Sequence, residues 1–348
     1  MYLIPPLRHD ELFQSWLISI CQYNDLKIYC SSRIKELRIR DISSLKSEDI
    51  LNICRYPEIN NRCNFVDVIY KHTIFPYITA FSDSSKILWE RIKKNYLLYL
   101  DNAKNYHQTY FNLSNPKVCI HCINEESNTF GGAYIHRTYQ IVGNYFCIKH
   151  DSKLKVANEF YNHTGNYLNL DLTDLPEFDN VYTDKLKVLS KDIYSVINGI
   201  LSSFTIEYIK MIIWIRMEEK GYIYNMIVKS RFFTEFNEYH DYFFLEQLNN
   251  VLYPAKENIF DFKKLILSPG ASASAYSPIQ IILIIRMLFD GGLREFIYYS
   301  KKTSTYEKLD SLIKKLKQKV YIDLYSNTDC FTLSENMYKF LLLTYGEY

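Results

Sequence analysis

The segment PKVCIHCINEESNTFGGAYIHRTYQIVGNYFCIKHDSKL, residues 116–154, carries the spacing that decides how this chain folds. Cys119 and Cys122 form a C-x2-C pair, and after 24 intervening residues Cys147 and His150 form a C-x2-H pair. Two residues between ligands allow one tight turn to aim both side chains at a single point, so two such turns supply four ligands. The pattern predicts a tetrahedral Cys3His zinc site with Cys119, Cys122, Cys147 and His150 as ligands.

A zinc ion with four protein ligands has no free position for water, whereas zinc that catalyses hydrolysis usually keeps one. We therefore expect a structural zinc ion and a protein that is not an enzyme. One alternative is that the cysteines are buried free thiols and His150 lies on the surface. Another is a zinc deaminase, whose signature places His-x-Glu shortly before Pro-Cys-x-x-Cys. The His-x-Glu of residues 9–11 lies far upstream, and Val118 rather than proline precedes Cys119.

The composition is that of a globular protein long enough to bury a large core, with 348 residues, 48% hydrophobic and 23% charged. The formal net charge is only +2, so any DNA contact must come from local basic patches. The five cysteines outside the zinc pattern lack ligand spacing, and the N-terminus lacks a signal-peptide pattern; both favour a cytoplasmic protein. The most apolar run, Ile279–Phe289, is too short to cross a bilayer, and the sequence contains no P-loop and no G-x-G-x-x-G.

Hydrophobic periodicity and capping residues predict a mainly α fold. Asp10 is a candidate N-cap for an amphipathic helix that contains Trp16, and further helices are expected over Ser43–Arg55 and Ser84–Tyr106. Three further helices are expected in the C-terminal half. One has Ser190 as its N-cap, one spans Thr205–Glu219 and is ended by Gly221, and one is a buried helix that begins at Pro278. The helix, glycine turn, short hydrophobic stretch and second helix that follow residue 205 favour a helix-turn-helix or winged unit.

We predict four segments in the chain. Residues 1–110 form an N-terminal helical domain, 111–160 the zinc-binding module, 161–185 a connector, and 186–348 a C-terminal helical domain. The last contains the helix-turn-helix-like segment and a lysine-rich tail. The expected fold class is thus mainly α, with helical domains around a small Cys3His module.

Two basic segments are candidates for contacts with DNA phosphates. Lys229 and Arg231 lie at the expected start of a helix, where backbone N–H groups also favour anions. The tail over residues 301–319 has seven lysines against two acidic residues. Its candidate DNA-binding residues are Lys314, Lys315, Lys317 and Lys319. The alternative for both segments is a solvated helix face.

The zinc segment also resembles the core of the TniQ/TnsD family, the target-selection proteins of heteromeric DNA transposons. The family pattern combines C-P-x-C, acidic residues, glycine, Tyr-x-(His/Arg)-Arg, His-Gln, a second glycine, C-x2-H and leucine. The matching residues are Cys119, Cys122, Glu125, Glu126, Gly132, Tyr134, His136, Arg137, Gln140, Gly143, Cys147, His150 and Leu154. Tyr139 stands where the family usually has histidine, and Ile120 stands where proline is common.

Further matches extend the resemblance over residues 4–296. They are Asp10, Glu11, Ser15, Trp16 and Leu17 near the N-terminus; His72, Thr73, Pro76, Tyr77 and Phe81 in a TnsD-type element; and Gly221, Tyr222, Phe244, Leu245 and Leu248 in the C-terminal half. A lone histidine beside aromatic residues is typically hydrogen-bonded in a core, and we interpret His72 in this way. Long TnsD proteins continue further, so the resemblance is to a C-terminally short member.

The resemblance implies a bacterial target-site selector without enzymatic activity. Such a protein binds duplex DNA at an attachment site and recruits the transposon AAA+ ATPase (TnsC/TniB-like), which brings in the transposase. An alternative is an adaptor that links an RNA-guided effector complex to the ATPase, which the near-neutral net charge favours. The segment around Trp16 is expected either to face the ATPase or to pack internally.

Overall fold

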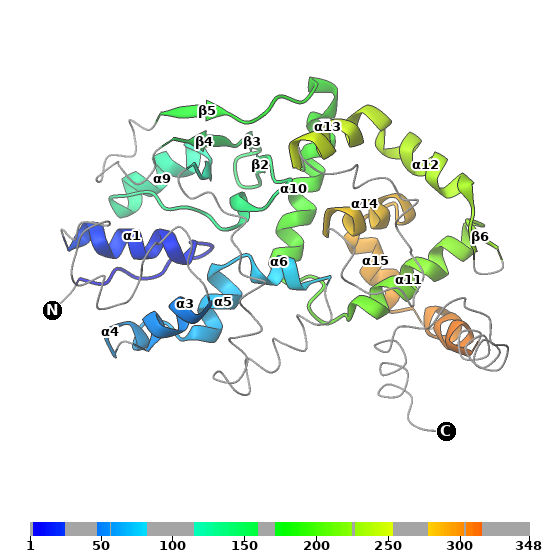
Figure 1. Ribbon diagram of the computed structural model, residues 1–348, viewed down its shortest axis with the longest axis horizontal. Coiled ribbons are helices and arrows are strands. Elements are labelled where there is room, and N and C mark those ends of the chain that lie inside the picture. Colours follow the sequence, from blue (N-terminus) through cyan, green and yellow to red (C-terminus); the bar gives the residue numbers. More distant parts are fainter. Residues whose placement is uncertain are drawn as a thin grey trace. The chain divides into compact units, whose positions relative to one another are not determined.

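The computed structural model describes residues 3–24, 47–55, 57–81, 115–158, 171–224, 227–252, 278–302 and 304–314 (Figure 1). About 60% of these residues are helical and the strands are short, so the fold is mainly α, as predicted. Two compact units are present: one contains residues 1–78 and 84–200, the other residues 79–83 and 201–348. The helix predicted over Ser84–Tyr106 and the candidates Lys315, Lys317 and Lys319 lie outside the described residues.

The helices before the zinc segment surround an apolar core. They are α1 (Phe13–Tyr23), α3 (Ser47–Cys54), α4 (Pro57–Asn60), α5 (Phe65–His72) and α6 (Phe75–Thr79). Helix α1 contributes Phe13 and Trp16 to a cluster that also contains Ile53 of α3 and Val68 of α5. Trp16 is fully buried, and its Nε1 donates a hydrogen bond to the Pro5 carbonyl at 2.8 Å. The expectation of internal packing is therefore confirmed for this tryptophan.

The zinc segment combines one helix with short antiparallel strands. Its elements are β1 (Lys117–Val118), α9 (Ile120–Phe130), the 3-10 turn η2 (Thr138–Gln140), β2 (Phe146–Cys147), β3 (Ser152–Lys153) and β4 (Lys155–Ala157). Strands β2 and β3 form a hairpin, while β4 lies between β1 and β5 (Leu172–Asp174). Helix α9 ends at Gly131, whose φ of 75° is a left-handed conformation that glycine adopts without strain.

The predicted N-cap role of Ser190 is wrong. Helix α10 (Thr183–Ile197) follows η5 (Asn180–Tyr182), and Ser190 lies inside the helix, fully buried. Its hydroxyl accepts hydrogen bonds from the backbone N–H groups of Tyr145 and Phe146, at 3.1 and 3.2 Å. A buried hydroxyl needs a partner, and the start of β2 supplies two donors that the local sequence does not reveal.

The predicted N-cap role of Asp10 is also wrong. Leu12 holds the N-cap position of α1, and Asp10 has a positive φ of 59°. The Asp10 carboxylate instead accepts hydrogen bonds from Arg137 and Thr138. A carboxylate can either cap a helix or accept hydrogen bonds in a buried ion pair. For Asp10, the long-range contacts with Arg137 and Thr138 select the second role.

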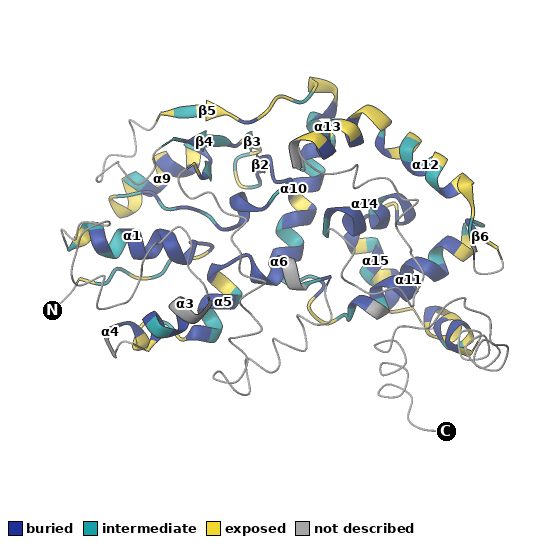
Figure 2. Ribbon diagram, viewed as in Figure 1, coloured by how far each residue is buried: buried dark blue, intermediate teal, exposed yellow. Residues whose placement is uncertain are grey.

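The second unit is built around a buried helix. Its elements are α11 (Ile206–Glu219), β6 (Ile223–Tyr224), β7 (Ile227–Val228), α12 (Ser230–His240), α13 (Tyr242–Leu252), α14 (Pro278–Leu288) and α15 (Leu293–Ser300), with a helical stretch over 304–314. Helix α14 is buried along almost its full length (Figure 2), and α11, α12 and α15 pack against it. Pro278 opens this helix, as predicted.

Local signals also place α11 correctly. Thr205 is the N-cap, and its hydroxyl accepts a hydrogen bond from the Tyr208 N–H at 3.1 Å. Gly221 follows the helix with a φ of 74°. The segment between α11 and α12 forms the β6–β7 hairpin, and a helix-turn-helix arrangement is not shown. In the described part of the chain, none of the helices has the length and apolar character needed to cross a bilayer.

Candidate metal centre

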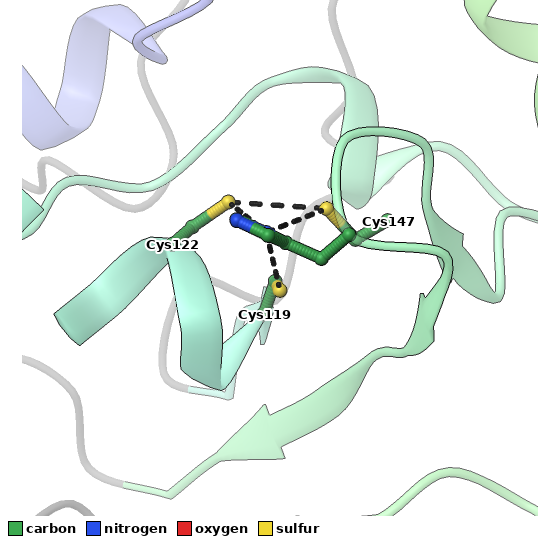
Figure 3. A group of neighbouring side chains, drawn as sticks. Cys119, Cys122 and Cys147 are labelled. Atoms are coloured by element: carbon green, nitrogen blue, oxygen red, sulfur yellow. Dashed lines mark hydrogen bonds between the residues drawn. The ribbon is translucent and has the colours of Figure 1, made fainter. Parts of the chain in front are cut away.

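The four predicted ligands meet at one point, although they come from two separate turns (Figure 3). Cys119 is the N-cap residue of α9, and Cys122 lies in its first turn. Cys147 ends β2, and His150 lies in the turn before β3, where Asp151 has a φ of 50°. The four ligand atoms lie within 4.8 Å of one another, and the three cysteines are buried. The predicted set of side chains is thus assembled as one cluster.

The distances between these atoms fit a tetrahedral zinc ion. With Zn–S bonds of about 2.3 Å and Zn–N bonds of about 2.0–2.1 Å, a tetrahedron has S–S edges of about 3.8 Å and S–N edges of about 3.5 Å. The sulfurs of Cys122 and Cys147 lie 3.8 Å apart. Nδ1 of His150 lies 3.5, 3.4 and 3.5 Å from the sulfurs of Cys119, Cys122 and Cys147. The geometry therefore suits a metal ion at the centre, and the donor set suits zinc.

The three thiols share their protons. Hydrogen bonds with Cys122 and Cys147 lower the pKa of Cys119, whereas the hydrogen bond with Cys119 raises the pKa of Cys122. A divalent cation favours the loss of these protons, because the thiolate is the form that binds metal.

A carboxylate orients the histidine ligand. His150 turns Nδ1 toward the sulfurs, and its Nε2 lies 2.9 Å from Oε1 of Glu125. Lys149 forms an ion pair with the same carboxylate. A proton on Nε2, donated to Glu125, leaves the Nδ1 lone pair free to bind a metal. The histidine is thus held in the tautomer that coordination needs.

Hydroxyl groups contact the sulfurs of the cluster. The Tyr139 hydroxyl lies 3.1 Å from the sulfurs of both Cys122 and Cys147. The Ser152 hydroxyl lies 3.3 Å from the sulfur of Cys119. Neither contact is predicted from the sequence. Spacing rules identify residues that bind a metal directly, but not hydroxyl groups that contact those residues.

A second group of potential ligands lies beside the first and consists of Cys122, Glu126 and His136. A tetrahedral zinc ion would hold nitrogen and oxygen ligands about 3.3–3.4 Å apart. Nε2 of His136 and Oε1 of Glu126 are instead 2.6 Å apart, which is a hydrogen-bond distance. We therefore assign these two residues to an ion pair and not to a metal site.

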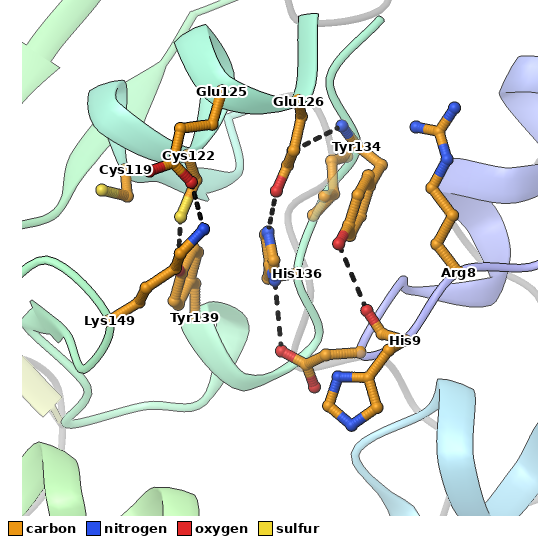
Figure 4. A network of polar contacts seen from close by, with 12 residues as sticks. Arg8, His9, Cys119, Cys122, Glu125, Glu126, Tyr134, His136, Tyr139 and Lys149 are labelled. Atoms are coloured by element: carbon orange, nitrogen blue, oxygen red, sulfur yellow. Dashed lines mark hydrogen bonds and ion pairs between the residues drawn. The ribbon is translucent and has the colours of Figure 1, made fainter. Parts of the chain in front are cut away.

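His136 lies between two carboxylates (Figure 4). Besides the contact with Glu126, its Nδ1 lies 3.4 Å from Oδ2 of Asp10. Burial lowers the pKa of His136, but the hydrogen bonds with Asp10 and Glu126 outweigh burial and raise this pKa to about 9. The rings of Tyr134 and Tyr139 lie on the imidazole at centroid distances of 4.5 and 4.6 Å. A protonated imidazole is therefore enclosed by two carboxylates and two aromatic rings at neutral pH.

Arg137 joins three segments of the first unit. Its Nε donates to Oδ1 of Asp10 at 3.0 Å, and its Nη1 donates to the carbonyls of Tyr70 and Thr73 at 2.6 and 3.2 Å. Thr138 donates to the other oxygen of the Asp10 carboxylate. Because Tyr70 and Thr73 lie at the C-terminal end of α5, the guanidinium also satisfies carbonyls that the helix leaves without intrahelical partners.

The N-terminal segment joins the zinc segment through its backbone. Glu11 and His136 form an antiparallel bridge, and the Leu12 N–H donates to the Ile135 carbonyl at 2.8 Å. The Ile135 N–H in turn donates to Oγ of Ser15 at 2.9 Å. Leu12 and Ile135 also belong to the small apolar core of the zinc segment. The start of α1 therefore belongs structurally to the module that carries the four candidate ligands.

Two further predicted residues have structural roles in the same region. Nδ1 of His72 lies 2.8 Å from the Glu11 carbonyl, and burial lowers the pKa of His72 to about 4, so the interpretation as a core histidine is confirmed. The Gln140 amide contacts both the N–H and the carbonyl of Lys117, at 2.9 and 2.8 Å. The Lys117 ammonium is buried and donates to the Ile141 carbonyl at 2.6 Å.

A cavity of about 510 Å³ opens beside the ligands. Its wall includes the carboxylates of Asp10 and Glu126, the rings of Phe130 and Tyr134, and Lys149. The carboxylates are already paired with His136 and Arg137, and Lys149 with Glu125. The charged groups of the wall are thus already engaged in ion pairs with neighbouring side chains.

The described candidates for DNA contact are exposed, but two of them already have acidic partners. Lys229 is the N-cap residue of α12. Arg231 forms an ion pair with Glu235 one turn later, and Lys314 forms one with Asp310 at 2.8 Å. These pairs reduce the positive charge that the two side chains offer to a phosphate. The four predicted metal ligands are thus brought together, whereas the phosphate contacts stay a prediction.

A scan of protein-family models found none that matches, and a search of curated proteins found no match either.

Proposed function

We propose that this chain is a target-selection protein of a DNA transposon. In this function it binds duplex DNA at an insertion site and recruits an AAA+ ATPase, while a structural zinc ion holds its N-terminal helical part in place. The zinc centre supports a structural role, because four protein ligands leave no coordination position for a reacting water.

The observation that carries the proposal is the convergence of the residues on which the family resemblance rests. Ten of the matching residues, spread over the chain from position 10 to position 140, make hydrogen bonds within and between the N-terminal segment, α5 and residues 117–140. The residues concerned are Asp10, Glu11, Ser15, His72, Thr73, Glu126, Tyr134, His136, Arg137 and Gln140. A match that arose from amino-acid composition would have no reason to converge in this way.

In the proposed function, the chain and the ATPase have separate roles. The sequence contains no P-loop, so the energy that drives transposition must come from a partner. The proposed protein contributes binding alone, with one surface for DNA and one for the ATPase.

The test uses the full-length protein, duplex DNA that contains candidate insertion sites, and the ATPase. We expect no ATP hydrolysis by the protein itself, DNA binding that weakens steeply with salt, and a ternary complex with DNA and the ATPase. Footprinting with and without the ATPase locates the bound site. Hydrolysis of ATP by the isolated chain, or failure to bind both DNA and the ATPase, would refute the proposal.

The second candidate function is an adaptor that docks on an RNA-guided effector complex and links it to the ATPase. The pairing of Arg231 and Lys314 with nearby carboxylates favours it, as does the net charge of +2. An adaptor binds the ATPase and copurifies with the effector complex, but shows no affinity of its own for duplex DNA even at low salt. The same salt titration therefore separates the two functions.

A further inference from the structure

Tyr139 occupies a special position beside the cluster of four ligands. Its hydroxyl oxygen lies 3.1 Å from the sulfur of Cys122 and 3.1 Å from the sulfur of Cys147. The side chain is buried, and a phenol is a hydrogen-bond donor at physiological pH. One hydroxyl hydrogen faces two sulfurs that become thiolates when a metal binds, and it can be donated to either.

A hydrogen bond to a metal thiolate has two physical effects. It fixes the direction in which the sulfur points, and it withdraws negative charge, which makes the thiolate less reactive toward protons and electrophiles. Tyr139 serves two of the three sulfurs, and Ser152 contacts the remaining one, Cys119.

The tyrosine is itself held by the ion-pair network. Its ring lies on the imidazole of His136 with 4.6 Å between the ring centres. His136 is fixed in turn by Glu126 and by Asp10 of the N-terminal segment. A protonated imidazole against an aromatic ring is attractive, so the charge on His136 favours this position of the tyrosine.

We propose that Tyr139 is a positioning residue for the metal: it holds the thiolates of Cys122 and Cys147 and slows zinc release, and His136 acts on the metal through it. The retention of zinc then depends on the ion pairs that fasten the N-terminal segment. This inference goes beyond the proposed function and holds whichever partner the protein recruits.

The test measures zinc release from the full-length, zinc-loaded protein into a chromophoric chelator. Tyr139→Phe keeps the ring and removes the hydroxyl, and we expect release at least about 10-fold faster, in line with the loss of a residue that supports metal ligands. The cobalt-substituted variant should keep the absorption of a tetrahedral thiolate site, because all four ligands remain. Tyr145→Phe is the matched control, since Tyr145 is a buried tyrosine of the same module whose ring contacts Phe178.

A second measurement separates positioning from general loosening. Alkylation of each cysteine by iodoacetamide, followed by mass spectrometry, should accelerate at Cys122 and Cys147 in Tyr139→Phe and much less at Cys119. Unchanged zinc release in Tyr139→Phe overturns the proposal. So does equal acceleration in Tyr145→Phe, or equal acceleration at all three cysteines, because each would indicate a global loss of stability.

The link to His136 is tested by a double-mutant cycle. His136→Gln should speed zinc release by about two- to fivefold, the size expected for loss of a cation–π contact. In the Tyr139→Phe background the same substitution should have little further effect on zinc release, because the hydroxyl through which His136 acts on the sulfurs is already absent. Additive effects would show that His136 acts on the metal by another route, which refutes this part of the proposal.

Discussion

Asp10 and Arg137 lie 127 residues apart in the sequence, yet Nε of Arg137 donates a hydrogen bond to the Asp10 carboxylate at 3.0 Å. Both side chains are only 7% exposed. The guanidinium also binds two carbonyls at the end of α5, so one side chain connects the N-terminal segment, α5 and the zinc segment. The stability of the first unit should therefore depend on this residue more than its position in a loop suggests.

Arg137→Ala should lower the free energy of unfolding by about 3–5 kcal/mol, because it leaves the Asp10 carboxylate buried without its charge partner. Urea denaturation of the zinc-loaded protein measures this change. Arg55→Ala is the control, since Arg55 is exposed and its loss should change stability by less than about 0.5 kcal/mol. Similar stabilities for the two variants would contradict the role of Arg137 as a connector.

Cys122→Ser should abolish stoichiometric zinc binding and yield aggregated or protease-sensitive protein. Structural zinc contributes on the order of 10–16 kcal/mol in finger peptides, so the loss of one ligand is severe. Elemental analysis and limited proteolysis provide the measurement. Cys63→Ser, at a free cysteine outside the cluster, should retain zinc. Full zinc occupancy in the Cys122 variant would rule out this ligand set.

The pKa of His136 predicts a pH dependence of stability. This pKa is about 9 in the folded protein and 6.5 for a free histidine, so protonation stabilises the fold below pH 6.5 and the contribution is lost as the pH rises through 9. The gap corresponds to about 3 kcal/mol. His136→Gln should remove this loss.

The quantity to measure is the difference in free energy of unfolding between wild type and His136→Gln, determined by urea denaturation at several pH values. Lys117 has the opposite effect on the pH dependence of stability. Burial lowers its pKa to about 7, so above pH 7 the folded protein no longer bears the cost of burying a charged ammonium and stability rises. Both proteins contain Lys117, so its contribution cancels. A difference that stays constant between pH 6.5 and 9 would show that His136 is not charged in the fold.

The lysine-rich tail should determine part of the salt dependence of DNA binding. The plot of log K against log salt has a negative slope, and each lost phosphate contact reduces the magnitude of that slope by about 0.9. Replacing four tail lysines with glutamine should therefore make the slope clearly less steep. The four are Lys314, Lys315, Lys317 and Lys319. The charge-matched control replaces four lysines of the first unit, Lys71, Lys153, Lys185 and Lys191. Equal slopes for the two variants would indicate that the tail is a solvated face.

Local signals in the sequence were sufficient wherever the partner of a side chain lies a few residues away. The metal ligands are predicted because two C-x2 turns are complete motifs, and Thr205 and Pro278 are predicted because a helix start is a local event. Asp10 and Ser190 were misassigned because their partners lie 127 and 45 residues away. An oxygen acceptor near a helical pattern looks like a cap unless the tertiary contact is known.

Tyr139 shows the same limit at the metal centre. The sequence marks it only as a tyrosine at a position where histidine is usual in the family that the segment resembles. Its contact with two sulfurs depends on η2 being placed beside β2 and α9, which no spacing rule encodes. The four candidate ligands can be predicted from the sequence, whereas the hydroxyl groups that contact them cannot.

The hydrogen bonds of Asp10, Leu12 and Ser15 to residues 135–138 have a consequence for synthesis on the ribosome. The start of α1 is made first, but its partners are translated more than a hundred residues later. At about 5–20 residues per second, this interval is on the order of 10 s. Throughout it, the apolar side chain of Leu12 lacks its core partners Ile135 and Ala157, so the nascent chain offers this hydrophobic side chain to chaperones until the segment that carries the four candidate ligands emerges.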